Sequence, residues 1–208
     1  NGNYAYIDSS AEAHKVLVEQ AQGTLITIAK DVKIQVEMNP SQVEAFRLIG
    51  YENRVLDHHE FRDDTKDAGE IGVDHTVTAL YEIVPKGGKM PGAASGSMLR
   101  YQKPAKPTLA ARSGELCTVK LRYKSPEGND SREMKHQVQS QVEPFSSASS
   151  DHQFAAVVAS FGMLLRGSQY KGSSSFASVQ QIAAQNAGGD SLRQELVELA
   201  HLAQGLSR

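Results

Sequence analysis

A change in hydrophobic period divides the chain of 208 residues into two parts. Between residues 32 and 38 the apolar residues Val32, Ile34, Val36 and Met38 alternate with charged or amide side chains. A period of two is typical of a β-strand with one buried face. After residue 150 the apolar residues recur every three or four positions, which is the period of an amphipathic helix. The two patterns predict an α+β fold, with a β-sandwich over residues 23–142 and a helical C-terminal region over 143–208.

Further strands are expected on both sides of a long loop. Residues 43–51 begin like a helix, but they are rich in β-formers, and Gly50 would cost a helix about 1 kcal/mol. Residues 75–85 are β-branched and aromatic and end at a proline. Residues 86–114 are rich in Gly, Pro, Ala and Lys, a composition typical of a long loop. Residues 115–124 and 132–139 flank the turn cluster SPEGND and predict a hairpin.

Three capping-box patterns mark the expected helices. In each, a serine is followed three residues later by Glu or Gln, so that the side chains can satisfy the first N–H groups of a helix. The pairs are Ser9 with Glu12, Ser150 with Gln153, and Ser191 with Gln194. A further helix is predicted over residues 176–187, because Gly188 and Gly189 follow it.

Composition limits the classes of protein. The formal net charge of −2 gives no indication of nucleic-acid binding. No apolar stretch approaches the length needed to span a membrane. The one cysteine, Cys117, excludes an internal disulfide and a cysteine-based zinc site, and its place in an alternating run predicts a buried thiol. The opening residues NGNYAYIDSS resemble neither a signal peptide nor a native start, so we expect the sequence to begin inside a longer protein.

Charged residues within the strand over 43–51 raise a first question of function. Gly50 there predicts a bulge or a close backbone approach. We expect the nearby charged side chains to pair with acids of the following loop and tie that loop to the sheet by forked hydrogen bonds. Alternatively, the same residues form a rim that meets a partner or a neighbouring domain. The candidate binding residues are Arg47, Tyr51, Glu52, Arg54, Asp63, Asp67 and Glu70.

Residues 57–70 offer an alternative chemistry. His58, His59 and Glu60 could bind a divalent metal and support a metal-dependent hydrolase. However, the segment contains no spaced histidine pair and no D-x-[DN]-x-[DN]-G calcium pattern, so a solvated charged loop is the favoured interpretation.

Motifs for nucleophilic catalysis are not assembled. The sequence contains no G-x-S-x-G, no P-loop and no G-x-G-x-x-G. Ser168 and Lys171 fit S-x-x-K, but the companion motifs of that chemistry are missing. A non-enzymatic role is therefore expected.

Three separated segments together resemble a known family. They are GNYAYIDSSAEAHKVLVEQ, then VEAFRLIGYENRVL with DAGEIGVDHTVTALYEIVP, and then FAAVVASFGMLLRGSQYKG. In this order they resemble the C-terminal part of bacterial von Willebrand factor type A (VWA) domain proteins, a lipoprotein-like family with an uncharacterised C-terminal domain. Some members carry the generic label "calcium-activated chloride channel homologue". The resemblance covers nearly the whole chain.

The resemblance implies both a context and a role. Residues 1–22 would be the last strand and helix of a VWA domain. We expect Val16 and Leu17 to dock on the β-sandwich or on a second copy of the chain, and the second case would give a homo-oligomer. A disordered N-terminus is the alternative. The metal site of VWA domains uses a D-x-S-x-S loop, which this chain lacks, so a divalent metal would bind upstream and no cofactor is expected here. The resemblance implies a binding or scaffold module at the bacterial cell envelope, periplasmic or membrane-anchored, with an unidentified protein partner.

Overall fold

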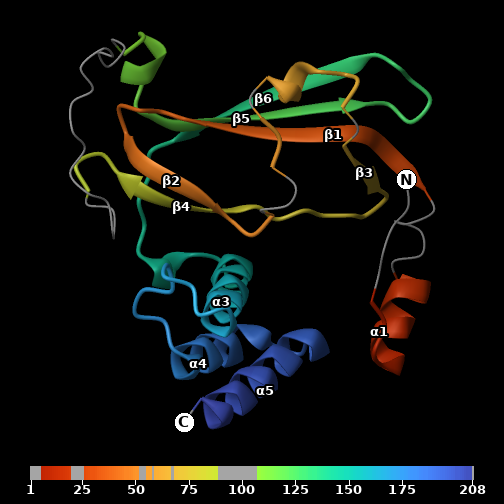
Figure 1. Cartoon of the computed structure of the whole chain (residues 1–208), viewed down its shortest axis with the longest axis vertical. Helices are drawn as coiled ribbons and strands as arrows, with labels where there is room; N and C mark the ends of the chain where they lie inside the picture. Colours follow the sequence, from red (N-terminus) through yellow and green to blue (C-terminus); the bar gives the residue numbers. More distant parts are fainter. Residues whose placement is uncertain are drawn as a thin grey trace. The chain divides into compact units, whose positions relative to one another are not determined.

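The chain forms a mixed α+β structure, as the sequence predicts. The computed structural model describes residues 6–19, 26–51, 55–57, 59–66, 68–88 and 107–207. An antiparallel sheet of four strands and one of two strands precede three helices in the C-terminal region (Figure 1). The chain divides into two compact units that are interleaved along the sequence. The sheet unit comprises residues 1–44, 53–79 and 104–140, and the helical unit comprises 45–52, 80–103 and 141–208.

The four-stranded sheet has the order β3-β1-β5-β6. Its strands are β1 (Thr27–Met38), β3 (Gly69–Gly72), β5 (Glu115–Lys124) and β6 (Ser131–Gln139). Lys33 lies opposite Arg122, which lies opposite Glu133, so these three side chains share one face of the sheet. The neighbouring positions Ile34, Leu121 and Met134 share the other face. The predicted strand over 32–38 and the predicted hairpin are confirmed, and the sheet has one polar and one apolar face.

A bulge interrupts β1 near its start. Asp31 has a φ of 52°, and the register with β5 shifts between Lys30 and Lys33. An extra residue in one strand bends that strand and redirects the side chain that it carries. Here the bulge brings the Asp31 carboxylate to Lys124 on β5, where the Nζ atom lies 2.6 Å from Oδ2.

Asn39 closes the turn after β1, and its side chain is buried. Its Nδ2 atom donates to the carbonyls of Ala111 and Glu115 at 3.1 and 2.6 Å, and its Oδ1 accepts from the Ser41 N–H at 3.0 Å. Ala111 belongs to η4 (Ala110–Arg112), the short 3₁₀ helix that precedes β5. The predicted Asn39-Pro40 turn therefore also fixes the end of the long loop over residues 86–114.

The helical unit contains the two-stranded sheet and the three C-terminal helices. The strands are β2 (Val43–Ile49) and β4 (Leu80–Pro85). The three helices are α3 (Ser150–Leu165), α4 (Phe176–Ala187) and α5 (Ser191–Leu206), and the short 3₁₀ helix η5 (Phe145–Ser147) precedes them. Val157, Val179, Ala183 and Ala200 form the buried centre of the helices. Phe161 and Phe176 add an edge-to-face ring contact at 5.9 Å. Two alanines in the centre allow the helices to approach closely.

The helix N-caps differ in part from the prediction. Ser149 and Asp190 cap α3 and α5, one residue before the expected Ser150 and Ser191. Each neighbouring residue is an equally good capping type, so the sequence pattern could not fix the boundary. The cap of α4 is Ser175, which forms a capping box with Ser178. The predicted helix over 176–187 is confirmed.

Two further predictions about strand ends are wrong in detail. Gly50 forms neither a bulge nor a close backbone contact: it follows the last residue of β2 with a φ of 76°, and a Cβ there would meet nothing within 4 Å. Tyr51 also has a positive φ, 59°, so both residues turn the chain out of the strand. The strand expected from residue 75 begins at Leu80.

A short helical segment lies near the N-terminus. It consists of α1 (Ser10–His14) and the π-helical turn η1 (Lys15–Glu19), and the Ser9 Oγ accepts from the Glu12 N–H at 3.1 Å. Tyr6 and Ile7 belong to no strand, and the rest of the predicted strand YAYI lies outside the described residues. Leu17 is 66% exposed within the chain, and its docking on a second copy stays a prediction.

Candidate functional site

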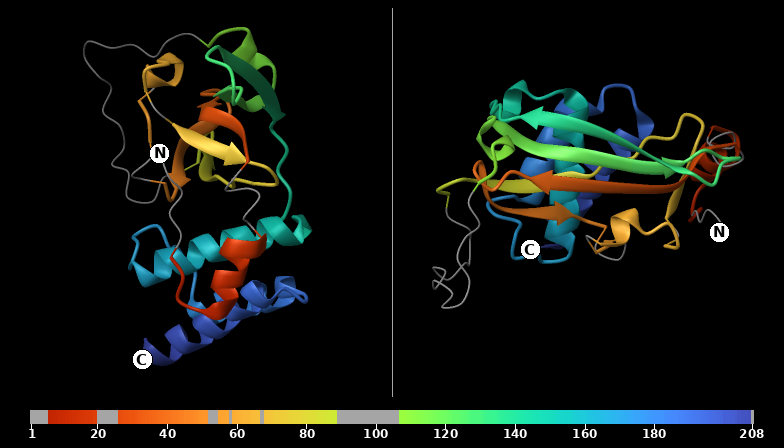
Figure 2. Two further views of the ribbon diagram at one scale, coloured as in Figure 1. Left: turned by 90° about the vertical axis from the view of Figure 1, so that its right-hand side faces the viewer. Right: turned by 90° about the horizontal axis from the view of Figure 1, so that it is seen from above.

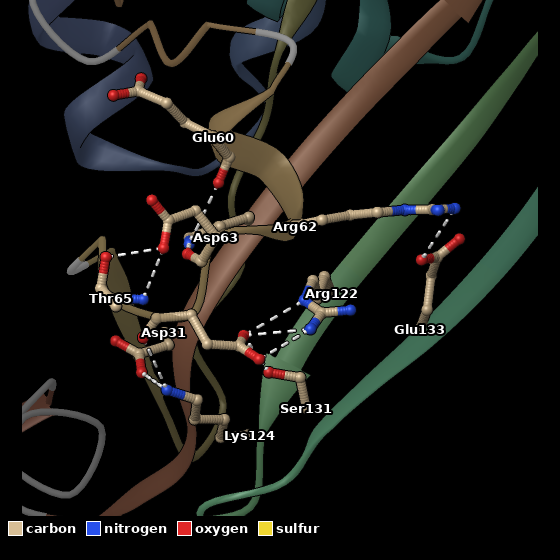
Figure 3. Close-up of polar contacts among 11 residues, drawn as sticks. Asp31, Glu60, Arg62, Asp63, Thr65, Arg122, Lys124, Ser131 and Glu133 are labelled. Carbon is tan, nitrogen blue, oxygen red and sulfur yellow. Dashed lines mark hydrogen bonds and ion pairs between the residues drawn. The ribbon is translucent and has the colours of Figure 1, made fainter.

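The candidate site is a network of charged side chains between the loop over residues 57–66 and the polar face of the four-stranded sheet (Figure 3). We call it the loop–sheet network. It contains the charged or hydroxyl residues Asp31, Lys33, Glu60, Arg62, Asp63, Asp64, Thr65, Lys66, Arg122, Lys124, Ser131 and Glu133.

Phe61 anchors the loop. It lies in η3 (Glu60–Arg62) between two charged residues, and its side chain is buried. The Glu60 carboxylate accepts from the Asp57 N–H at 2.9 Å and pairs with Lys66 at 2.8 Å. The contact with Lys66 lowers the pKa of the Glu60 carboxyl. One buried ring and local hydrogen bonds therefore give this short polar segment a defined shape.

Lys33 is a buried cation of the network. The residue is only 3% exposed, and its Nζ atom donates to the backbone carbonyls of Glu60, at 3.3 Å, and of Asp63. A buried ammonium is costly unless its protons are satisfied, and carbonyl dipoles supply part of what water would. Lys33 thus fixes the loop to the centre of the sheet through the loop backbone.

Asp64 is held by a forked contact. The Arg122 Nη2 atom lies 2.9 Å from Oδ2 and 3.1 Å from Oδ1, and the Nε atom lies 3.3 Å from Oδ1. The Ser131 hydroxyl donates to Oδ1 at 2.5 Å. The hydrogen bond from Ser131, with those from Arg122, holds the pKa of the Asp64 carboxyl below its usual value.

Lys124 links the bulge of β1 to the loop. It pairs with Asp31 and also donates to the Asp64 carbonyl at 3.3 Å. The hydrogen bond to Asp31 raises the pKa of the Lys124 ammonium. Strands β1, β5 and β6 therefore all hold the same loop.

A forked tie of the predicted kind is present, and among the described residues it joins Asp64 to Arg122. The Asp63 carboxylate accepts from the backbone and side chain of Thr65, at 2.9 and 2.6 Å, and these bonds lower its pKa. The Glu70 carboxylate accepts from the Thr27 hydroxyl at 3.4 Å. Glu52, Arg54 and Asp67 lie outside the described residues.

Arg47 belongs to a second cluster, in the helical unit. Its Nε atom lies 2.5 Å from the Glu82 carboxylate on β4, and its Nη2 atom lies 3.3 Å from the Met163 sulfur. The guanidinium also stacks over the Tyr170 ring at 4.3 Å. Arg47 therefore ties β2 to β4 and to the end of α3.

The alternative metal site lies partly outside the described residues. His59 is exposed, Glu60 is engaged by Lys66, and His58 lies outside the described residues. Within the described ranges, no three His, Cys, Asp or Glu side chains come together to hold a metal ion.

The remaining chemical candidates occupy structural positions. Cys117 is buried in β5, and desolvation raises the pKa of its thiol, which makes the thiolate scarce. The Ser168 hydroxyl accepts from the Tyr170 N–H at 3.2 Å in the turn after α3. Two open surface hollows, of about 480 and 440 Å³, are lined by residues 143–152 and 180–202 of the helical unit and include none of the predicted site residues.

Several residues of the network were missed by sequence reasoning. Arg122 and Lys124 looked like the polar positions of an amphipathic strand, and Lys33 looked like a solvent-facing residue of the alternating run. The only sequence signal was the unusual accumulation of basic residues at these positions of β1 and β5. No helix in the described part of the chain is long and apolar enough to cross a membrane.

Comparison with known proteins gives a family but no activity. Residues 23–206 match the model of the family described as "Uncharacterized protein YfbK, C-terminal". The chain is 39% identical to the "Uncharacterized protein YfbK" of Escherichia coli (strain K12) over 209 aligned positions, which cover all of this chain and 35% of that protein. The chain thus spans about a third of the length of this relative. No solved structure matches the chain. The chain belongs to the family of YfbK C-terminal domains.

Proposed function

We propose that this domain is a non-enzymatic binding and scaffold module of a bacterial VWA-domain protein, acting in protein–protein interaction at the cell envelope, either periplasmic or membrane-anchored. The family match over residues 23–206 and the resemblance of the chain to the C-terminal part of VWA proteins support this context.

One observation carries the proposal. The charged side chains of the loop–sheet network are used to hold the loop in place. Asp64 is committed to Arg122 and Ser131, Lys33 to two backbone carbonyls, and Glu60 to Lys66. A catalytic set requires groups free to meet a substrate in a cleft, whereas a fixed, charged surface suits recognition of another protein.

The loop presents the exposed part of this surface. Arg62 has a side chain that is 70% exposed, and the ion pair that it forms with Glu133 is a distant one, at 3.8 Å. Lys66 and Asp64 are about half exposed. Because these side chains emerge from a loop that three strands hold, a partner would meet them with little ordering cost.

The test uses Arg62→Glu, with Arg112→Glu as the control. Arg112 is an exposed arginine in η4, so the control makes the same charge change away from the loop. Full-length protein would be retrieved from its native envelope, the co-purifying protein identified and purified, and its affinity measured by calorimetry. We expect saturable binding that Arg62→Glu weakens about tenfold and Arg112→Glu leaves unchanged. Equal affinities for the parent, Arg62→Glu and Arg112→Glu would show that the loop over residues 57–66 does not contact the partner.

A metal-dependent hydrolase remains the second candidate, because His59 is exposed beside Glu60. It predicts stoichiometric divalent metal in the purified protein and loss of that metal in the His58→Ala/His59→Ala double variant. Metal analysis that gave this result would replace the binding proposal with the hydrolytic one.

A further inference from the structure

The outer strand β6 has an open edge. In the described part of the chain β6 pairs with β5 alone, and the right-hand view of Figure 2 shows it beyond β5 at the margin of its sheet. Its four central residues, 134–137, are all exposed, which means that both faces of the strand are open there. A long edge strand with free N–H and C=O groups is a template for another strand.

Glu133 has one carboxylate oxygen with few contacts near this edge. Its Oε1 atom is buried and accepts no hydrogen bond from any described residue. Lys135 Nζ lies 3.2 Å from this oxygen and forms an ion pair with it, and this contact lowers the pKa of the Glu133 carboxyl. A lysine of a second strand would add a further cation beside this carboxylate.

In one antiparallel register, β6 and a second copy of β6 place opposite charges against each other. When Met134 lies opposite Met134 of a second copy, each Glu133 lies opposite Lys135 of the other copy, on the polar face. Centring the pair on Glu133 or on Lys135 instead places like charges opposite each other. A register whose centre falls between two residues, such as Met134 opposite Lys135, would place the polar face of one sheet on the same side as the apolar face of the other.

We propose that two copies of this domain associate through antiparallel pairing of β6 with β6, centred on Met134. The two sheets then form one continuous sheet, two Glu133–Lys135 pairs close across the seam, and the two Met134 side chains, each 57% exposed in the single chain, cover one another. A seam of one strand is small, so the dimer is weak and reversible.

This inference deepens the proposed function, on which it rests, by naming a second copy of the chain as one partner. The first experiment is sedimentation of the purified chain at pH 8 over a range of concentrations. We expect a monomer–dimer equilibrium that Lys135→Glu weakens at least about tenfold, because both cross-strand pairs become repulsive. The double variant Glu133→Lys/Lys135→Glu restores the pairs and should dimerise like the parent. A mixture of the single variants Glu133→Lys and Lys135→Glu should form heterodimers, because each lysine then faces a glutamate.

The second experiment tests the register of the β6–β6 pair. It leaves Glu133 unchanged, so the charge opposite Arg122 on β5 stays the same. Met134→Cys should form a symmetric disulfide rapidly under mild oxidation, because the two β-carbons lie opposite each other. Val138→Cys is the control, since the two copies of residue 138 would lie about 26 Å apart along the strands. A wild-type chain that stays monomeric, unchanged dimerisation of Lys135→Glu, or equal cross-linking of the two cysteine variants overturns the inference. Such results would not affect the proposed binding of an envelope protein, because the affinity measurement with Arg62→Glu tests that binding separately.

Discussion

The helical unit and the sheet unit are stabilised by different kinds of contact. The helices bury Val157, Val179, Ala183 and Ala200 together, with partly buried aromatic and aliphatic side chains around them. The sheet unit has fewer buried apolar residues, and its polar face carries the loop–sheet network and the buried Lys33. The helical unit should therefore respond most to changes in side-chain volume or to a buried charge, and the sheet unit to loss of hydrogen bonds and to pH.

The largest effect is expected from Ala183→Asp in α4. The Ala183 side chain is fully buried, so an aspartate there places an uncompensated charge in the helical core. We expect a loss of more than about 3 kcal/mol in the free energy of unfolding, measured by urea denaturation. The neighbouring Ala184→Asp is the control, because Ala184 is exposed on the same helix and should lose less than about 1 kcal/mol. Similar losses in both variants would show that α4 does not bury this face.

An intermediate effect is expected from Lys33→Met in β1. Methionine keeps most of the length of the buried stem but leaves the carbonyls of Glu60 and Asp63 without their donor. The cost should be about 1–3 kcal/mol. Hydrogen exchange should speed up over residues 59–66 and stay unchanged in α3–α5. The exposed Lys171→Met serves as the control. If exchange rises equally in the helices, the two units are not stabilised separately.

The smallest effect is expected from Asp64→Asn, as a change in pH dependence. The pKa values of Glu60, Asp63, Asp64 and Glu133 are all lowered in the folded chain by hydrogen bonds and cationic neighbours. Because the unfolded chain then binds more protons, their contribution is complete above the unfolded pKa, about 4, and is lost as the pH falls through the folded pKa values. Asp64→Asn should flatten this acid-induced loss of stability, measured by thermal melts between pH 2 and 6. An unchanged slope would mean that Asp64 titrates alike in both states.

Period and turn chemistry predicted most of the fold. The alternation around Val36 predicted β1, the cluster SPEGND predicted the hairpin of β5 and β6, and Gly188 predicted the end of α4. These features are local, so residues close in sequence determine them. The N-caps of α3 and α5 were displaced by one residue because adjacent residues compete for the same position.

The candidate site was predictable only in part. The sequence indicated that the loop over residues 57–70 is charged and that an arginine fork would hold it, but it did not indicate which arginine. Arg122 lies 58 residues from Asp64, and the strand order β3-β1-β5-β6 brings them together. Arg47 looked suitable because it is near the loop in sequence, yet it pairs with Glu82. Long-range pairing depends on topology, which the local pattern does not contain.

The interleaving of the two units has a consequence for experiments with shortened chains. Strands β2 and β4 belong to the helical unit although they precede β5 and β6 in the sequence. A protein ended after residue 142 would retain Arg47 but lose both Met163 and Tyr170, which its guanidinium contacts. A cut between the sheets and the C-terminal helices therefore separates Arg47 from both of these contacts, and a transplanted set of helices would keep them only together with β2.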